Sequence, residues 1–154
     1  MVTLRPADAY DSRALWEWRN DPVARAASLD TREIPWDDHV AWFASSLLKD
    51  DRLMLIGVDA ANPPERVGVV RFDFDTPGSA IVSITVAPAA RGRGIGQELL
   101  RTGIEYVQLS RGRVVLKAQI RASNRASLTI FERAGFVRSE QVDDVISLEA
   151  TREP

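Results

Sequence analysis

The chain has 154 residues, about the length of one domain, with 20 Lys and Arg against 22 Asp and Glu and a net charge of −2. This slightly acidic balance argues against general nucleic-acid binding. With no cysteine and one histidine, the chain has no means of forming a disulfide framework, a zinc–thiolate site or a polyhistidine metal site, and we expect no metal. No signal-peptide core or membrane-length apolar run is present, so we expect a single-domain cytoplasmic protein without a membrane partner.

The first third of the chain predicts one short strand and two helices. Residues 2–5 form the expected strand, which Pro6 ends. Residues 8–20 predict a helix, and residues 23–34 predict a loop or a short helical turn. A second helix is expected over residues 35–48. Its apolar residues recur every three or four positions and predict one buried face: Trp36, Val40, Phe43 and Leu47.

The remainder of the chain predicts a sheet with two further helices. Residues 52–58, 66–75 and 80–86 read as an antiparallel meander. A helix over residues 94–110, a strand over 114–120 and a helix over 124–134 follow, and Gly135 fits a left-handed helix end. Residues 136–149 fit two short strands or a hairpin. The order indicates an α+β domain whose mixed, mainly antiparallel sheet is flanked by about four helices.

Three glycines and two arginines lie between the third meander strand and the next helix. Free N–H groups at a helix start, with glycines that let the backbone approach closely, suit a phosphate group. The glycine spacing is G-x-G-x-G, which fits neither the Rossmann fingerprint nor the P-loop. The alternative is a glycine-rich turn that only ends a loop and starts a helix.

Two motifs resemble the GNAT superfamily of acetyl-CoA-dependent acetyltransferases. From Arg91 the chain reads R-x-x-G-x-G, which is similar to the family's pyrophosphate loop. From Asn124 it reads NRASLTIFERAGF, which is similar to the family's N-x-x-A/S segment followed by an aromatic position and E-K/R-x-G-F. The resemblance covers residues 80–137 through these motifs, and the rest of the chain through the order of its helices and strands. It implies that residues 80–137 are the acetyl-CoA-binding core. Residues 1–50 would supply the acceptor side.

The resemblance implies a set of acetyl-CoA contacts. The end of the third meander strand would bind the pantetheine amides through Ile84, Thr85 and Val86. The pyrophosphate would be held by the backbone amides of Arg91, Gly92, Arg93, Gly94, Ile95 and Gly96. Asn124 would bind the pantetheine side, and Ser127 and Phe131 would lie near the thioester sulfur.

The catalytic groups depart from the common family pattern. Phe131 stands where many GNAT enzymes carry the Tyr that protonates the leaving thiolate. Ser127, one turn earlier, matches the Ser of the branch with ribosomal-protein N-terminal acetyltransferases and can donate a hydrogen bond, although it also fits a packing or capping role. The candidate bases are His39 and Asp73. For each, a structural role is the alternative, and a water chain would also serve.

The acceptor side resembles one GNAT branch more closely. Residues 15–22 (LWEWRNDP), 34–43 and 69–73 are similar to the branch with nucleotide-linked amino-sugar N-acetyltransferases. We therefore favour a small-molecule amine, such as a sugar nucleotide, facing Arg19, Trp42 and Arg71, whose alternatives are ion pairing and core packing. A ribosomal-protein type N-terminal acetyltransferase and an inactive CoA-binding sensor remain open, as does the choice of monomer or homodimer.

Overall fold

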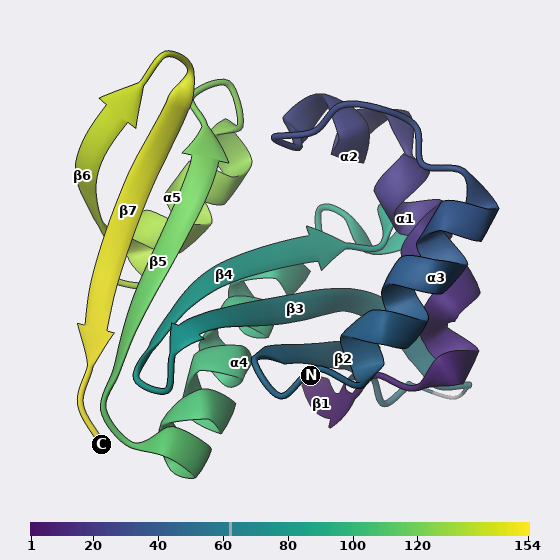
Figure 1. Cartoon of the computed structure of the whole chain (residues 1–154), viewed down its shortest axis with the longest axis horizontal. Helices are drawn as coiled ribbons and strands as arrows, with labels where there is room; N and C mark the ends of the chain where they lie inside the picture. The colour runs from purple at the N-terminus through teal and green to yellow at the C-terminus, as the bar shows by residue number, and fades with distance from the viewer. Residues whose placement is uncertain (62) are drawn as a thin grey trace.

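The computed structural model describes residues 1–61 and 63–154. Its framework is one seven-stranded sheet in the order β1-β2-β3-β4-β5-β7-β6, in which only β4 and β5 run parallel (Figure 1). The strands are β1 (Val2–Pro6), β2 (Arg52–Asp59), β3 (Glu65–Thr76), β4 (Ser79–Val86), β5 (Val114–Arg121), β6 (Val137–Val142) and β7 (Val145–Arg152). The α+β architecture, the meander and the final hairpin are thereby confirmed.

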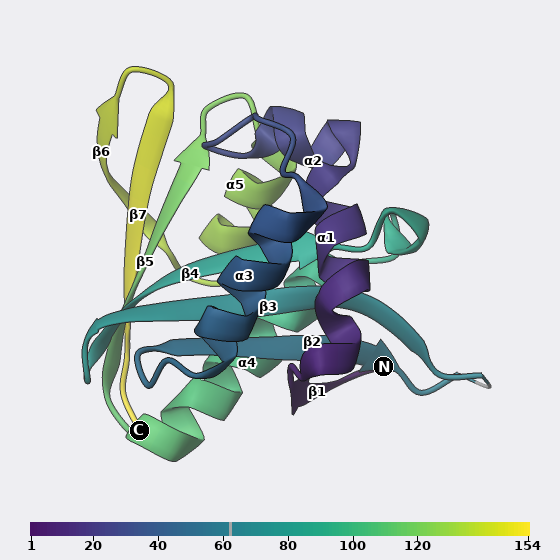
Figure 2. The same ribbon diagram turned by 45° about the vertical axis from the view of Figure 1, so that its right-hand side comes forward.

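Helices cover both faces of the sheet. They are α1 (Ser12–Asn20), α2 (Pro22–Ala27), α3 (Trp36–Leu47), α4 (Ile95–Arg111) and α5 (Arg125–Arg133), with short 3-10 turns η1 (Ala9–Asp11) and η2 (Pro88–Ala90). In Figure 2, α1 and α3 lie in front of the strands while α4 and α5 lie behind them. The α1–α3 pair and the α4–α5 pair are therefore separated by the sheet.

The core lies mainly between α4 and the sheet. A Cβ on Gly103 of α4 would approach Val70 and Phe72 of β3 to within 3.4 Å, so glycine allows the helix to pack closely. The helix buries Leu99, Leu100, Gly103, Ile104 and Val107. Its exposed side carries the ion pair of Arg101 with Glu105 at 3.1 Å. The amphipathic pattern thus placed this helix correctly.

Two helix predictions need correction. The helix expected from residue 8 begins as η1, and α1 starts only at Ser12. In α3 the predicted buried face is wrong at two of its four residues: Phe43 is buried and Trp36 is partly buried, but Val40 and Leu47 are 40% and 36% exposed. The buried residues of α3 are His39, Phe43 and Ser46. Polar side chains could turn inward because each has a partner, namely the Ser12 carbonyl for His39 and the Arg52 guanidinium for Ser46.

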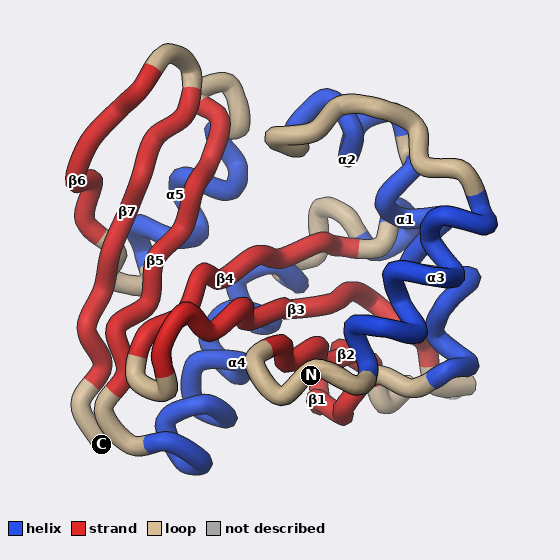
Figure 3. Tube along the Cα trace, in the orientation of Figure 1, coloured by secondary structure: helices blue, strands red, loops and turns tan. Residues whose placement is uncertain are grey.

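The sheet opens between β4 and β5. These strands pair only through Ser79–Ile81 and Val115–Lys117, and beyond this short contact they diverge (Figure 3). The Ala87 N–H donates to the Val67 carbonyl on β3 at 2.8 Å. This hydrogen bond fixes which residues of β4 turn their backbone groups toward β3 and which turn them away. The backbone groups of Val82, Ile84 and Val86 consequently face the opening rather than β3.

No helix in the described part of the chain is long and apolar enough to cross a membrane. Among residues 1–61 and 63–154 there is also no cluster of three or more metal-ligating side chains of His, Cys, Asp or Glu.

Candidate active site

The loop before α4 has the geometry of an anion site. Gly92 and Gly94 have φ values of +76° and +73°, and a Cβ at either position would meet no atom within 4 Å. Gly94 begins α4, and no side chain caps that end of the helix. The first N–H groups of this 17-residue helix therefore have no capping acceptor among the described side chains, and they lie beside the end of β4. The residues present fit a pyrophosphate group.

The two loop arginines are both ion-paired. Arg91 Nη2 lies 2.5 Å from Asp21 Oδ2, at the junction of α1 and α2. Arg93 Nη2 lies 2.7 Å from Asp59 Oδ2 at the end of β2, and its Nη1 lies 3.6 Å from Glu65. The glycine-rich loop is thus anchored at both arginines to acids that are distant in the sequence.

Close packing joins the loop to the walls of the opening. A Cβ on Gly96 would lie 2.8 Å from Ile130 of α5 and 3.4 Å from Val86 of β4. Glycine therefore lets the start of α4 approach both neighbours. Ile84 is partly buried against the main core, and Val86 against the apolar cluster below α1. Because these side chains pack inward, it is the backbone of β4 that borders the opening.

Asn124 and Ser127 lie at the start of α5, and Phe131 lies in the core. Asn124 Oδ1 accepts the Ser127 N–H at 3.3 Å and so caps the helix, while the Ser127 side chain is half-buried. The ring of Phe131 is 2% exposed and packs edge-on against Phe136, with 5.0 Å between centroids. The Phe131 ring therefore packs in the core, and its place near the thioester sulfur stays a prediction.

The predicted acceptor residues lie on the sheet face covered by α1 and α3. Arg71 of β3 is opposite Ser83 of β4, and its guanidinium carbon lies 5.7 Å from the centre of the Trp42 ring. Asp73 accepts Arg52 at 2.6 Å and lies 3.0 Å from Arg71 Nε. Both oxygens of Asp73 are thus engaged by arginines, so this carboxylate positions the cations. It does not stand free as the expected base.

His39 is buried rather than placed in the opening. It is 4% exposed, stacks between Trp36 and Phe43, and its Nε2 donates to the Ser12 carbonyl at 2.8 Å. Burial lowers the pKa of His39, against the effect of that hydrogen bond, and the charge of Arg19 lowers it further. The structure therefore gives His39 a packing role between α3 and α1, and the expectation of a base is corrected.

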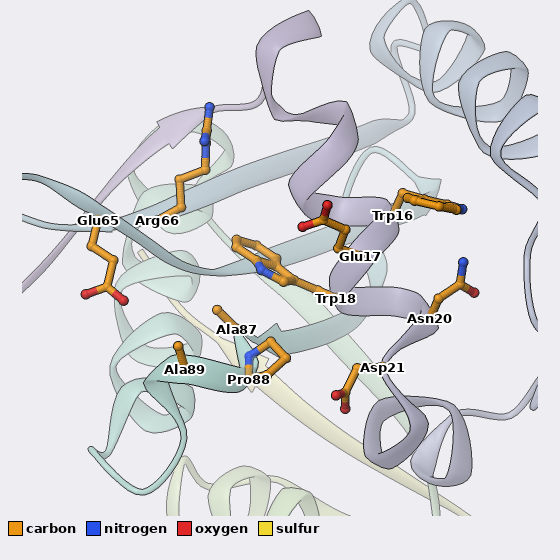
Figure 4. Close-up of a pocket in the computed structure, with 10 residues that line it drawn as sticks. All are labelled: Trp16, Glu17, Trp18, Asn20, Asp21, Glu65, Arg66, Ala87, Pro88 and Ala89. Atoms are coloured by element: carbon orange, nitrogen blue, oxygen red, sulfur yellow. The ribbon is translucent and has the colours of Figure 1, made fainter.

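A cavity of about 470 Å³ lies beside the glycine-rich loop (Figure 4). Its walls come from α1, the start of β3 and the segment after β4: Trp16, Glu17, Trp18, Asn20, Asp21, Glu65, Arg66, Ala87, Pro88 and Ala89. None of these residues was predicted to bind acetyl-CoA or the acceptor. The cavity shares Asp21 and Glu65 with the contacts of the loop arginines, so it lies against an ion pair of each arginine.

Two residues of the site were missed from the sequence. Asp21 was given no role of its own in the sequence analysis, yet it caps α2 through the Ala24 N–H and binds Arg91. Arg121, at the end of β5, donates to the carbonyls of Ser28 and Leu29, at 2.6 and 3.1 Å, and also binds Asp144. It thereby ties β5 to the connection that follows α2. The contacts of Asp21 and Arg121 join segments that are distant in the sequence. The local sequence therefore gave no signal for them except the charge of the two side chains.

Comparison with known proteins agrees with this geometry. Residues 1–137 match the family described as Acetyltransferase (GNAT) domain. The chain belongs to this family. Its enzyme class is that of the acetyl-CoA-dependent GNAT acetyltransferases, as the two sequence motifs implied.

Curated relatives of this GNAT chain act on small molecules. It is 25% identical over 152 residues to L-methionine sulfoximine/L-methionine sulfone acetyltransferase of Salmonella typhimurium, covering 94% of this chain and 85% of the relative. It is 32% identical over 99 residues to mycothiol acetyltransferase of Gordonia bronchialis, covering 64% of this chain. That match spans only 30% of the longer relative.

Solved structures share the whole GNAT fold. A domain from Methanocaldococcus jannaschii superposes with a TM-score of 0.85 at 19% identity, covering 99% of both chains. YncA from Salmonella typhimurium, solved with its cofactor acetyl-CoA, superposes with a TM-score of 0.77 at 25% identity, covering 97% of this chain and 93% of that one.

Proposed function

We propose that this protein transfers the acetyl group of acetyl-CoA directly to the primary amine of a small molecule. The observation that carries the proposal is the opening between β4 and β5, which leads to the uncapped start of α4. Acetyl-CoA supplies an acetyl group activated as a thioester. The relatives that acetylate small molecules, and the YncA structure with acetyl-CoA, support the same donor and the same kind of reaction.

Backbone groups do most of the binding in this proposal. The free groups of Ile84 and Val86 bind the pantetheine amides, and the amides from Arg91 to Gly96 hold the pyrophosphate. Asn124 keeps its Nδ2 donors for the pantetheine side while its Oδ1 caps α5. Orientation of the two reactants is then the main source of acceleration.

The proton chemistry is assigned to Ser127 and solvent. The Ser127 hydroxyl donates a hydrogen bond toward the sulfur as negative charge develops there. The chain has no cysteine to carry an acetyl group, so the amine attacks the thioester directly. A water chain removes the proton from the amine, because His39 and Asp73 are both occupied structurally.

The finer proposal for the acceptor is a nucleotide-linked amino sugar. It is supported by the WRNDP segment at residues 18–22 and by the grouping of Trp42 with Arg71. An inactive CoA-binding sensor is the second candidate, because the buried Phe131 leaves the usual acid position without a proton donor.

Release of free thiol from acetyl-CoA is the decisive measurement. The full chain is assayed with amino-sugar nucleotides, amino acids, peptides with free N-termini and polyamines. Thiol release that requires one class of amine, with the acetylated amine identified by mass, supports the enzyme. Binding of acetyl-CoA in calorimetry without thiol release for any amine supports the sensor. A failure to bind acetyl-CoA contradicts both.

A further inference from the structure

On the sheet face that α3 covers, Arg52 and Arg71 share the carboxylate of Asp73. We infer that the acceptor carries an anionic group, a carboxylate or a phosphate ester, close to its amine, and that Arg71 and Arg19 bind that group. The inference rests on the proposed function and narrows its substrate to anionic amines. It excludes polyamines, which are amines of the opposite charge.

Arg71 is a largely buried cation whose Nε donor is not used in a hydrogen bond. Its side chain is 28% exposed, on the sheet face that α3 partly covers, beside the ring of Trp42. Its Nε is buried and makes no hydrogen bond to any described residue, although Asp73 lies 3.0 Å away. A buried N–H that has an ion-pair partner but no aligned hydrogen-bond acceptor is unfavourable, and an anion bound at the guanidinium would supply such an acceptor.

The surrounding charges leave Arg71 and Arg19 in excess. Arg52 is satisfied by Asp73 and by the Ser46 hydroxyl, so Asp73 is divided between two cations. Within residues 1–61 and 63–154, no carboxylate comes within ion-pair distance of Arg19. Asp30, which feels the charge of Arg19, is bound by Arg32 at 2.8 Å. Burial, together with Arg52 and Arg19 and against Asp73, lowers the pKa of Arg71.

The position of Arg71 also limits the length of the acceptor. Its partner across the ladder is Ser83 of β4, and the other edge of β4 faces the opening. The Arg71 strand is therefore one strand spacing, about 4.8 Å, from the strand that borders the thioester site. An acid group within a few bonds of the amine spans that distance. An α-amino acid and an amino-sugar phosphate both meet this condition, and experiment separates them.

The test compares amines that differ only in the acid group. The pairs are an α-amino acid with its carboxamide, and a nucleotide-linked amino sugar with the free amino sugar, with spermidine as a cationic amine. We expect the anionic member of one pair to have at least a tenfold higher kcat/KM. The pair that responds identifies the source of the anion.

Variants locate the effect. In Arg71→Gln we expect the kcat/KM for the anionic amine to fall about 10- to 100-fold through KM, as expected for loss of a charge-assisted contact. The kcat/KM for its uncharged partner and the KM for acetyl-CoA should change less than about threefold. Arg101→Gln, on the exposed side of α4, removes the same charge far from β3 and is the matched control. Calorimetry of the anionic amines against protein loaded with CoA gives a readout without turnover.

The outcomes separate the inference from the proposed function. If uncharged amines or spermidine are acetylated as well as the anionic ones, the inference is wrong and the acetyltransferase proposal stands. The same holds if Arg71→Gln weakens both members of a pair equally. If no amine supports thiol release, the proposed function fails. In that case the absence of calorimetric binding by every anionic amine also overturns the inference.

Discussion

Arg91 of the glycine-rich loop and Asp21 of the α1–α2 junction form an ion pair, with 2.5 Å between Nη2 and Oδ2. The same carboxylate caps α2 through the Ala24 N–H at 3.1 Å. The hydrogen bond from Arg91 lowers the pKa of Asp21, as does the N–H of Ala24. One residue thus connects the acceptor-side helices with the loop proposed to hold the pyrophosphate, and it places a negative charge beside that loop.

Removal of this charge should favour acetyl-CoA. Asn is as good a helix cap as Asp, so Asp21→Asn keeps α2 capped while freeing Arg91 for a phosphate. We expect the Kd for acetyl-CoA to fall about threefold at low salt, with a smaller effect at high salt. Calorimetry at two salt concentrations measures it. Glu105→Gln, which breaks an exposed pair on α4, is the control. Weaker binding in Asp21→Asn would mean that the ion pair orders the loop.

Gly94 should matter for the cofactor beyond its effect on stability. In Gly94→Ala the left-handed backbone costs about 1 kcal/mol, and the methyl group enters the space left open for the phosphate. We expect the Kd for acetyl-CoA to rise at least tenfold. Gly112→Ala also strains a positive φ, but at the opposite end of α4, so its Kd should stay unchanged. Equal Kd values in the two variants would argue against a phosphate at Gly94.

Asn124 allows capping and cofactor binding to be separated. Asp preserves an acceptor for the Ser127 N–H but lacks the amide donor, so Asn124→Asp should keep the melting temperature. If Asn124 donates to the pantetheine, the KM for acetyl-CoA should rise about tenfold. Asn124→Ala should lose both functions, with a stability loss of about 1 kcal/mol. An unchanged KM in Asn124→Asp would leave Asn124 as a cap alone.

Ser127 is tested by removal of its hydroxyl. Ser127→Ala should lower kcat about tenfold with little change in either KM, because the hydrogen bond is made to charge that develops during the reaction. Steady-state kinetics with saturating acetyl-CoA measures the effect. Ser110→Ala, whose hydroxyl binds carbonyls of its own helix, is the matched control. An unaltered kcat would assign protonation of the thiolate to solvent.

Asp11 should make the stability depend on pH in the acid range. Burial raises the pKa of its fully buried side chain, but hydrogen bonds from Arg5, the Asp8 backbone and Arg66 outweigh burial and lower the pKa to about 2. A lowered folded pKa stabilises the protein above the unfolded pKa, and this contribution disappears as the pH falls through about 2. It amounts to about 2 kcal/mol at neutral pH.

Denaturation of Asp11→Asn checks this linkage. The variant should be about 2 kcal/mol less stable than the parent at pH 7, and the difference should shrink between pH 4 and pH 2. Asp143→Asn, an exposed change in a turn where Asn accepts the positive φ, should show no such trend. A difference that is constant across the acid range would contradict the pKa assigned to Asp11.

Local sequence predicted the parts of the site that a few consecutive residues build. The glycine-rich loop needs only the spacing of Gly92 and Gly94, and the cap of α5 needs only Asn124 and Ser127. Contacts across the fold were beyond reach. The partnership of Arg71 with Ser83 depends on strand register, and Arg121 reaches the carbonyl of Ser28 from 93 residues away.

The error in α3 has a physical cause. Apolar spacing predicts a buried face only when polar residues stay in water. His39 and Ser46 turn inward because the Ser12 carbonyl and the Arg52 guanidinium satisfy them, and Val40 is left outside. The sequence does not show that His39 binds the Ser12 carbonyl, and for this reason His39 was also considered as a base.

The short contact between β4 and β5 would give an acetyl donor bound in the proposed site a structural part in the fold. Three residue pairs join β4 to β5. The rest of the gap between these two strands suits an extended chain that carries amide groups. A bound pantetheine arm would act as an eighth strand supplied from outside the polypeptide. We therefore expect hydrogen exchange at Val82, Ile84 and Val86 to slow when CoA binds. The melting temperature should rise with the concentration of acetyl-CoA or CoA. The thermal stability of the folded enzyme would therefore increase with the concentration of its own substrate and product.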